Sequence, residues 1–513
     1  MKGVLLMRKA GILLHISSLP SRWGIGDFGP ESIRFASFLN KAGISLWQIL
    51  PITPIEEIMG NSPYSPTSAF AGNILFISPE LLVNSGYLDK NDPLLSDPPK
   101  FSNEKVDFVK AREFKHKLLH KAFERFKKIG DCSDYELFFN QNQYWVESWS
   151  FFTALKKINK GKAWYDWDAG LKFRTHEALN NAWLEYQNEI EYERFVQYIF
   201  FQQAKVFRKA LNSLEIELVG DVPIYTTLDS ADVWVKPWLF QLNEEMHPTC
   251  VAGVPPDYFS KTGQLWGNPL YNWDKMREDN FSWWISRLHH SLQLFNYLRI
   301  DHFRGLIGYW SVPYLEKTAE NGAWQAVPHR EFFKALRQGL PNGKFWAENL
   351  GIITQDVTSV MKDMEFPGML IMQFAWNEPG SNYYAPHNHT KENVVYTGTH
   401  DNNTTLGWFM NDATEEEIRN LSSYIGKDLN QNNICDELIR LTFSSIADYA
   451  VIPMQDLLRL GTEARINVPS TAKDNWSWRM LPDAASETLA QDILKKAIIY
   501  GRSQAKHDTE IES

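Results

Sequence analysis

The sequence predicts an α/β protein: a single (β/α)8 TIM barrel interrupted by helical subdomain insertions. Three observations support this fold class. Eight short apolar runs, each ending in polar residues, occur along the 513-residue chain, as expected of strands buried on both faces. Segments with helical periodicity separate these runs, which is the alternation of a barrel. A chain of this length with 44% hydrophobic residues can also bury the core of one large barrel.

The predicted strands are unevenly spaced along the chain. They are residues 11–15, 44–50, 216–221, 297–301, 345–348, 369–374, 394–397 and 450–455. The gap between the second and third strands is far longer than one crossover helix requires, so we expect an inserted, mainly helical subdomain at about 78–210. The stretch between the third and fourth strands is also longer than one crossover helix requires. Its part at about 230–290 is rich in Gly, Pro and Trp and is expected to form a cleft-covering loop region. Residues 1–506 would then be one catalytic barrel with these insertions, and 507–513 a flexible tail.

Helix signals fall between the predicted strands. Pro30 opens an amphipathic run that ends at Gly43, a typical C-terminal glycine. Thr414 precedes three glutamates at 415–417, which suit the positive end of a helix dipole. The stretch 106–130 alternates charged with apolar residues at helical spacing, which indicates an exposed amphipathic helix rather than a membrane or nucleic-acid surface.

Charge and cysteine content limit the partners and the compartment. A net charge of −10 argues against a general nucleic-acid or anionic-membrane binder. The three cysteines, Cys132, Cys250 and Cys435, are far apart and lack zinc-site spacing, which favours reduced thiols in a cytosol. The apolar run 3–7 is too short for a signal-peptide core, and no run approaches the roughly 20 residues of a membrane span. We therefore expect a cytoplasmic protein with no nucleic-acid or membrane partner.

Aromatic residues are abundant, with 20 Trp, 20 Tyr and 31 Phe. Most of them are expected in the core. Several instead stand beside Gly, Pro and Asn in predicted loops, where an aromatic face suits a sugar ring. These are Trp23, Tyr64, Tyr258, Trp266 and Trp476.

Charged residues cluster at the end of the fourth predicted strand. The segment 298–305 reads LRIDHFRG and places Arg299, Asp301, His302 and Arg304 beside apolar residues. Burying such charges is costly unless they converge on one another or on a polar ligand. We expect a functional site here, and a structural Arg–Asp network is the alternative.

Two more carboxylates follow predicted strands in the same way. Glu348 follows the fifth strand, and Asp401 lies just beyond the seventh, next to His400. Any one of these acids could be structural. Because catalytic residues of barrels lie at the C-terminal ends of strands, Asp301, Glu348 and Asp401 together are predicted to form a catalytic trio on one face.

The chemistry that suits this trio is reaction at an acetal carbon. An oxocarbenium-like transition state needs negative charge on one side and a proton donor on the other, which paired carboxylates supply. Glycosyl transfer or hydrolysis is therefore predicted. A metal site is the rival interpretation, but each acid comes from a different strand and no His-Glu-x-x-His spacing occurs. We expect no metal and no cofactor.

The segments around the trio resemble a known family. Asp301 in RIDHFRGL, Glu348 in FWAENLG and Asp401 in THDNNTT are similar to motifs of the 4-α-glucanotransferases called amylomaltase or disproportionating enzyme, in the α-amylase clan. The similarity runs nearly end to end. Further matching stretches are SSLPSRWGIGDFGP, WQILPITP, NSPYSPTSAFAGN, GDVPIY, VAGVPPDYFSKTGQLWGNPLYNW, PGMLIMQFAW, QDLLRLGTEARINVP and NWSWR.

The resemblance implies a role for each acid. Asp301 would be the nucleophile that forms a covalent β-glucosyl-enzyme. Glu348 would be the general acid and then the base that activates the acceptor hydroxyl, and Asp401 would bind sugar hydroxyls and hold the distorted ring. The implied substrate-binding residues are Tyr64, Asp221, Asp257, Tyr258, Trp266, Asn268, Arg299, His302, His400 and Asn467.

Two of these assignments carry a physical expectation of their own. Arg299 is suited to keep Asp301 ionised through charge-assisted hydrogen bonds, which would lower the pKa of that carboxyl. His302 and His400 would contact ring hydroxyls, and buried packing is their alternative role. Two positions depart from the family pattern: Asn349 follows the acid where aspartate is common, and Ser65 stands where glutamine is commoner.

The implied activity is that of a 4-alpha-glucanotransferase. It would pass an α-1,4-glucan segment, from maltooligosaccharides or from starch or glycogen, to the 4-hydroxyl of glucose or another glucan. Retention of configuration predicts carboxyl groups ~5 to 5.5 Å apart, against ~6.5 to 9.5 Å for inversion. Transfer also requires exclusion of water, and residues 252–260 resemble the family's covering loop, although they could be a plain surface turn. The alternatives are an α-amylase-like hydrolase and a catalytically silent glucan-binding or regulatory protein.

Overall fold

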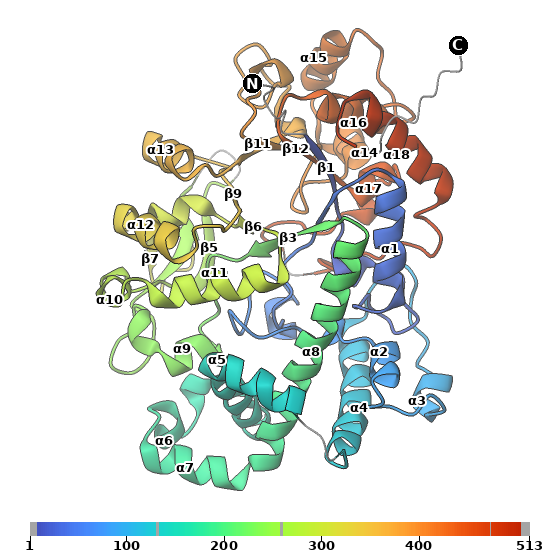
Figure 1. Cartoon of the computed structure of the whole chain (residues 1–513). Coiled ribbons are helices and arrows are strands. Elements are labelled where there is room, and N and C mark those ends of the chain that lie inside the picture. Colours follow the sequence, from blue (N-terminus) through green and yellow to red (C-terminus); the bar gives the residue numbers. More distant parts are fainter. Residues whose placement is uncertain (1–7, 130–132, 257–259, 472, 504–513) are drawn as a thin grey trace, which may run out of the picture.

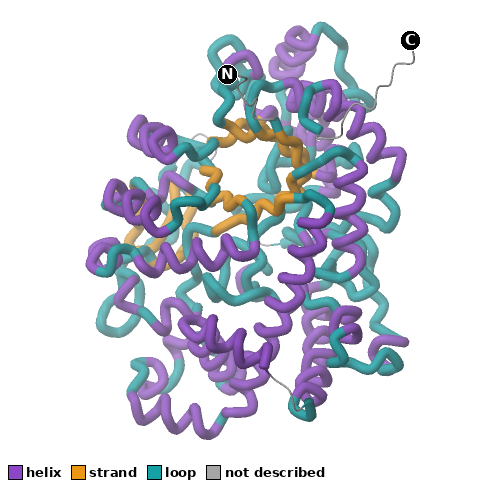
Figure 2. Tube along the Cα trace, viewed as in Figure 1, coloured by secondary structure: helices purple, strands orange, loops and turns teal. Residues whose placement is uncertain are grey.

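Eight parallel strands form a ring at the centre of the molecule (Figure 2). The computed structural model describes residues 8–129, 133–256, 260–471 and 473–503, so the predicted tail at 507–513 lies outside the described residues. The ring confirms the predicted barrel, and each of its strands overlaps one predicted run. The strands are β1 (Lys9–Leu13), β2 (Leu46–Gln48), β3 (Glu217–Val222), β6 (Tyr297–Ile300), β9 (Phe345–Ala347), β10 (Gly368–Ile371), β11 (Asn393–Tyr396) and β12 (Tyr449–Pro453).

The strand order shows where the barrel closes. The order is β10-β11-β12-β1-β2-β3-β6-β9, with every pair parallel. Its two ends, β9 and β10, are connected by a backbone hydrogen bond from the Ala347 N–H to the Pro367 carbonyl at 2.9 Å. The buried side chain of Asn349 adds a second link, because its Oδ1 accepts from the Met369 N–H at 2.7 Å. We call this junction the seam.

Helices lie around the ring (Figure 1). The long stretch of sequence between β2 and β3 is mainly helical. α8 and α11 contact β3, and α16 contacts β12. The helices are α1 (Pro30–Lys41), α2 (Pro79–Asn84), α3 (Pro93–Ser96), α4 (Phe108–Phe126), α5 (Ser133–Ile158), α6 (Ala169–Lys172), α7 (His176–Glu185), α8 (Gln187–Ser213), α9 (Ala231–Val235), α10 (Trp273–Glu278), α11 (Ser282–Leu294), α12 (His329–Gly339), α13 (Gln355–Met364), α14 (Thr405–Gly407), α15 (Glu415–Ile425), α16 (Ile434–Ser444), α17 (Met454–Leu457) and α18 (Glu487–Ile499).

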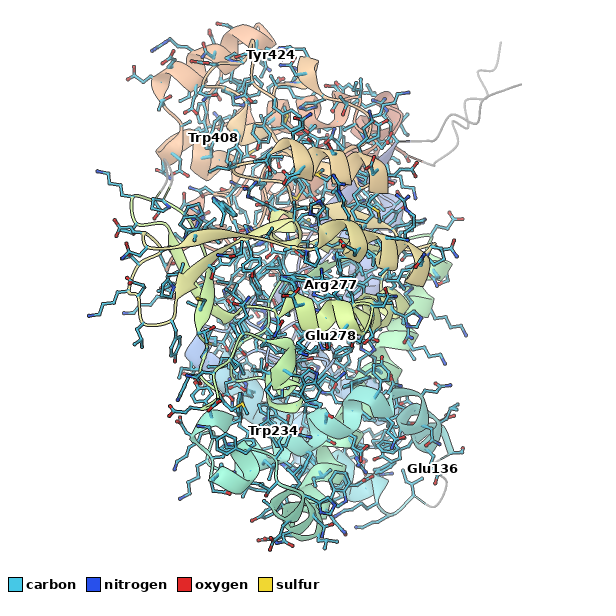
Figure 3. All side chains as sticks on the ribbon, turned by 90° about the vertical axis from the view of Figure 1, so that its left-hand side faces the viewer. Glu136, Trp234, Arg277, Glu278, Trp408 and Tyr424 are labelled. Atoms are coloured by element: carbon cyan, nitrogen blue, oxygen red, sulfur yellow. The ribbon has the colours of Figure 1, made fainter. Side chains whose placement is uncertain are left out.

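The helices between β2 and β3 pack through aromatic side chains against α9, which follows β3. Trp234 of α9, which is labelled in Figure 3, is 1% exposed. Its ring contacts Phe151, Phe152 and Trp167. α4 buries Phe114, Leu118 and similar residues along one stripe, which confirms the amphipathic helix predicted there. Within the described ranges, no helix is both long enough and apolar enough to cross a membrane.

The predicted helix signals correspond to observed helix ends. α1 begins at Pro30, and Gly43 just beyond its end has a φ of 66°. Thr414 caps α15: its hydroxyl accepts from the Glu417 N–H, and the Glu417 side chain accepts from the Thr414 N–H at 2.8 Å. Local sequence therefore determines where these two helices start.

A second, antiparallel sheet was not predicted. Its order is β5-β4-β7-β8, formed by β4 (Cys250–Val254), β5 (Gln264–Pro269), β7 (Gly308–Pro313) and β8 (Ala323–Ala326). The stretch at 230–290, expected as a cleft-covering loop region, contains β4, β5 and α9 to α11. All four residues of β8 are exposed, so β8 shows none of the apolar alternation by which strands are recognised.

Candidate active site

The charged residues at the end of β6 lie next to Glu348. Asp301 follows the strand directly, and His302 adopts a left-handed conformation with φ 46° and ψ 51°. This turn aims the His302 N–H at Glu348, whose Oε2 accepts at 2.8 Å. Glu348 itself follows β9, and its Oε1 accepts from the Leu350 N–H at 2.9 Å. Both oxygens of Glu348 are thus oriented by backbone donors, beside the residue that follows Asp301.

Arg299 connects two carboxylates. Its Nη1 donates to Asp221 Oδ1 and Oδ2 at 2.8 and 2.7 Å, and to Asp301 Oδ1 at 3.0 Å. The side chain of Asp221 is 0% exposed, whereas that of Asp301 is 24% exposed. The Tyr64 hydroxyl completes the group by donating to Asp221 Oδ2 at 2.7 Å. Asp221 therefore balances the buried guanidinium, and Asp301 is the partner that solvent or a ligand reaches.

Asp401 lies on the loop after β11 with its side chain 45% exposed. Asn467 Nδ2 donates to its Oδ1 at 2.7 Å, and Arg465 Nη2 donates to its backbone carbonyl at 2.7 Å. The neighbouring His400 places Nε2 3.4 Å from Asp401 Oδ2, and its ring stacks on Tyr64 with centroids 5.0 Å apart. Tyr64 thereby links the Asp401 loop to the Asp221–Arg299 pair.

Burial sets the pKa values of the acids. It raises the pKa of Glu348, against the lowering effect of Arg299 and the two backbone N–H groups, and Asp401 adds repulsion. Burial also raises the pKa of Asp301 well above its ordinary value, and Arg299 offsets only part of the rise. The expectation that Arg299 lowers the pKa of Asp301 is therefore wrong in net direction, because desolvation and three neighbouring carboxylates outweigh one guanidinium.

The two histidines at the site are neutral near pH 7. Burial lowers the pKa of His302 to about 4, with a contribution from Arg304, and burial likewise lowers the pKa of His400, against the raising effect of Asp401. A neutral imidazole has one donor and one acceptor nitrogen, which matches a sugar hydroxyl.

The remaining predicted residues lie partly in this network. Trp266 of β5 contacts the His302 ring edge to face, with centroids 4.8 Å apart. Asn268 instead donates from Nδ2 to the Thr226 carbonyl at 3.0 Å, a bond that does not involve the acids. Asp257 and Tyr258 lie outside the described residues. The expected covering loop 252–260 is corrected at its start, because residues up to Val254 belong to β4.

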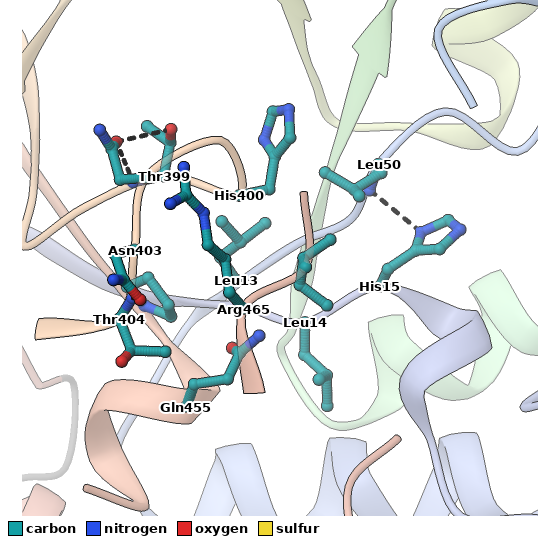
Figure 4. A pocket seen from close by; sticks show the side chains of 13 residues that line it. Leu13, Leu14, His15, Leu50, Thr399, His400, Asn403, Thr404, Gln455 and Arg465 are labelled. Carbon is teal, nitrogen blue, oxygen red and sulfur yellow. Dashed lines mark hydrogen bonds between the residues drawn. The ribbon is translucent and has the colours of Figure 1, made fainter. Parts of the chain in front are cut away.

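A pocket next to the Asp401 loop is lined by a histidine that the sequence analysis did not single out (Figure 4). His15, just after β1, lines it together with Thr399, His400 and Arg465. The Leu50 N–H donates to His15 Nδ1 at 3.2 Å, and burial lowers the pKa of His15 to about 3, aided by His400. The available signal was a polar residue at a strand end, the same signal that identified Asp301 and Glu348.

The arrangement can perform displacement at an acetal carbon. It presents a partly exposed carboxylate held by a guanidinium, a second carboxyl oriented by backbone donors, and neutral donors around them. Among the described residues, no group of three or more His, Cys, Asp or Glu side chains is arranged to hold a metal ion.

Comparisons with known proteins place this site in a family. The sequence model of the 4-alpha-glucanotransferase family matches residues 14–484. A 4-alpha-glucanotransferase from Aquifex aeolicus is 43% identical over 497 residues, covering 97% of this chain and all of the relative, and one from Synechocystis is 42% identical, covering 96% and 98%. The structure of the Streptococcus agalactiae amylomaltase in complex with acarbose superposes with a TM-score of 0.92 at 36% identity, over 97% of this chain and 100% of that one. With a barrel that carries its acids at the strand ends and similarity along nearly its whole length, the chain belongs to the 4-alpha-glucanotransferase family.

Proposed function

We propose that the protein cleaves an α-1,4-glucan, retains a glucanosyl unit on Asp301 and transfers it to the 4-hydroxyl of glucose or another glucan. One observation supports the assignment most directly. The His302 N–H donates to Glu348, and His302 directly follows Asp301. This hydrogen bond therefore holds the proposed acid next to the turn that carries the proposed nucleophile. The family of the chain supports the same reaction.

In the first step, the protonated Glu348 gives its proton to the glycosidic oxygen while an Asp301 oxygen attacks the anomeric carbon. The bond to the leaving glucan breaks and a glucosyl ester of Asp301 forms. Because Arg299 occupies Asp301 Oδ1, Oδ2 is the proposed attacking atom. We place the negative charge of the pair on Asp301, because its Oδ1 accepts directly from the Arg299 guanidinium, whereas Glu348 accepts from neutral backbone N–H groups.

In the second step, Glu348 takes the proton of the acceptor 4-hydroxyl as that oxygen attacks the anomeric carbon. The ester bond breaks and Asp301 is released as a carboxylate. Two inversions give net retention. Asp401, fixed by Asn467 and exposed on the loop, is proposed to hold the hydroxyls of the distorted ring, with His302 and His400 as neutral partners.

The finer expectations belong to the same proposal. Glucose and maltooligosaccharides would be acceptors, and the amylomaltase solved in complex with acarbose supports oligosaccharide binding. Residues 1–506 would form one catalytic unit, with a subdomain at about 78–210 and a cleft-covering region at about 230–290. A cytoplasmic location is supported by Cys250 and Cys435, which are both free thiols.

Incubation of the purified protein with maltotriose tests the function. Transfer predicts glucose together with a ladder of maltooligosaccharides longer than the substrate. An α-amylase-like hydrolase would give only shorter sugars with a reducing end for every bond cleaved. A glucan-binding protein without activity would leave maltotriose unchanged while binding it, and either of these outcomes would refute the proposal.

A further inference from the structure

The loop that presents Asp401 is fastened at both ends by one buried carboxylate outside the loop. Asp456, in α17 after β12, accepts from the Thr397 hydroxyl at the start of the loop with Oδ2 at 2.5 Å. At the other end, it accepts from the Thr405 N–H with Oδ1 at 2.7 Å and from the Thr405 hydroxyl with Oδ2 at 2.8 Å. Asp401 lies midway between these two threonines.

This carboxylate is buried without a counter-ion. Asp456 is 1% exposed, and no Lys, Arg or His in the described ranges forms an ion pair with it. Burial raises the pKa of Asp456, and the lowering influences are hydrogen bonds from Thr397 and Thr405. A buried charge of this kind is costly unless its hydrogen bonds are used.

A carboxylate fits these three donors in a way that an amide does not. Each of its oxygens accepts, so the backbone N–H and both hydroxyl hydrogens find partners. An asparagine would accept from the Thr405 N–H but would present its NH2 group to the two hydroxyls, whose hydrogens would then lose their acceptor. Thr397 and Thr405 are both fully buried, so water does not replace it.

The middle of the loop is held by the same part of the chain. Arg465 and Asn467, which follow Asp456 by about ten residues, bind the backbone and the side chain of Asp401. The segment after β12 therefore fixes both the ends of the loop and its centre.

We infer that Asp456 is a positioning residue for the reaction, acting through the loop 397–405 to place Asp401 against the sugar. This inference rests on the proposed function, since it assumes that Asp401 contacts substrate. The consequence is specific: loss of the Asp456 hydrogen bonds lowers kcat for transfer, and does so only while Asp401 is present.

Three variants and a control test the inference with maltotriose as substrate. Asp456→Asn and Thr405→Val are expected to lower kcat by about ten- to a hundredfold, the size expected for hydrogen bonds to a charged group, with a smaller change in KM. Thr405→Ser keeps the hydroxyl and should retain kcat within about threefold. Thr442→Val is the matched control, because Thr442 is a fully buried threonine whose hydroxyl donates to the Leu438 carbonyl in α16, outside the loop. It should lower the melting temperature but not kcat.

A double-mutant cycle separates positioning from general stability. If Asp456 acts through Asp401, adding Asp456→Asn to Asp401→Asn should lower kcat by less than threefold further. Full additivity of the two losses, or an equal loss of kcat in Thr442→Val, would overturn the inference. A wild-type protein that yields no ladder would instead refute the proposed function, so the two failures are distinguishable.

Discussion

At the scale of single residues, the roles proposed for Asp301 and Glu348 require a carboxyl group, which an amide side chain of the same shape cannot replace. Asp301→Asn and Glu348→Gln are nearly isosteric, yet the first removes the nucleophile and the second the proton donor. Each should lower the rate of glucose release from maltotriose by several orders of magnitude.

The matching stability measurement is the thermal unfolding of each variant. Asp301→Asn keeps an oxygen that accepts from Arg299 and should unfold close to the wild type, whereas the amide of Glu348→Gln can accept from only one of the His302 and Leu350 N–H groups, so its melting temperature should fall slightly while the fold is kept. Near-normal activity in either variant would remove the role assigned to that residue.

The pH dependence of the reaction follows from the burial of Glu348. Glu348 must be protonated to act as an acid, and burial raises its pKa, so activity is lost only as pH rises through that raised value. The basic limb of kcat/KM against pH should therefore lie above the ordinary glutamate value of 4.5. Asp301 must be ionised, which gives the acidic limb, and both limbs report the coupled pair. A basic limb at or below 4.5 would contradict the assignment of Glu348.

Local residue patterns were sufficient to predict that the three proposed catalytic acids follow strands of the barrel. Asp301, Glu348 and Asp401 each follow an apolar strand, which is a local signal. The net pKa of Asp301 could not be predicted, because it depends on carboxylates from three other strands or loops. The part played by Asp456 was also hidden, since its partners Thr397 and Thr405 lie more than 50 residues away in the sequence.

At the scale of elements, the capping box of α15 offers a stability test that is separate from catalysis. Thr414→Ala removes the acceptor of the Glu417 N–H and should lower the free energy of unfolding by ~1 kcal/mol, while Thr414→Ser should restore most of it. Urea unfolding followed by circular dichroism measures both. An equal loss in the two variants would show that the hydroxyl is not what stabilises this helix start.

The barrel strands were predictable and the antiparallel sheet was not, for a physical reason. A strand buried on both faces is a continuous apolar run, which is visible in the sequence. β5 alternates between half-buried and exposed residues until Pro269, and β8 is exposed throughout, so their pairing depends on β4 and β7 rather than on their own composition. Tertiary context determines such strands.

At the scale of the whole molecule, the seam is the junction of the ring where the two neighbouring strands, β9 and β10, form no ladder of paired residues. Asn349→Ala removes the acceptor of the buried Met369 N–H, and should lower the free energy of unfolding by ~1 to 3 kcal/mol. Hydrogen exchange should quicken in β9 and β10 more than in β1 and β2. Asn321→Ala, at an exposed position, is the control and should change neither quantity. Uniform quickening across all strands would mean that the side chain does not close the ring locally.

The antiparallel sheet has a consequence for how the enzyme can change. β4 and β5 belong to the connection that leads into Asp301, whereas β7 and β8 belong to the connection that leads from Asp301 to Glu348, and β4 pairs with β7. One sheet therefore joins the connection before Asp301 to the connection between Asp301 and Glu348. Mutations that reshape this sheet to suit a different acceptor are expected to shift both carboxyls together. Acceptor preference and the rate of bond cleavage should therefore evolve as one trait.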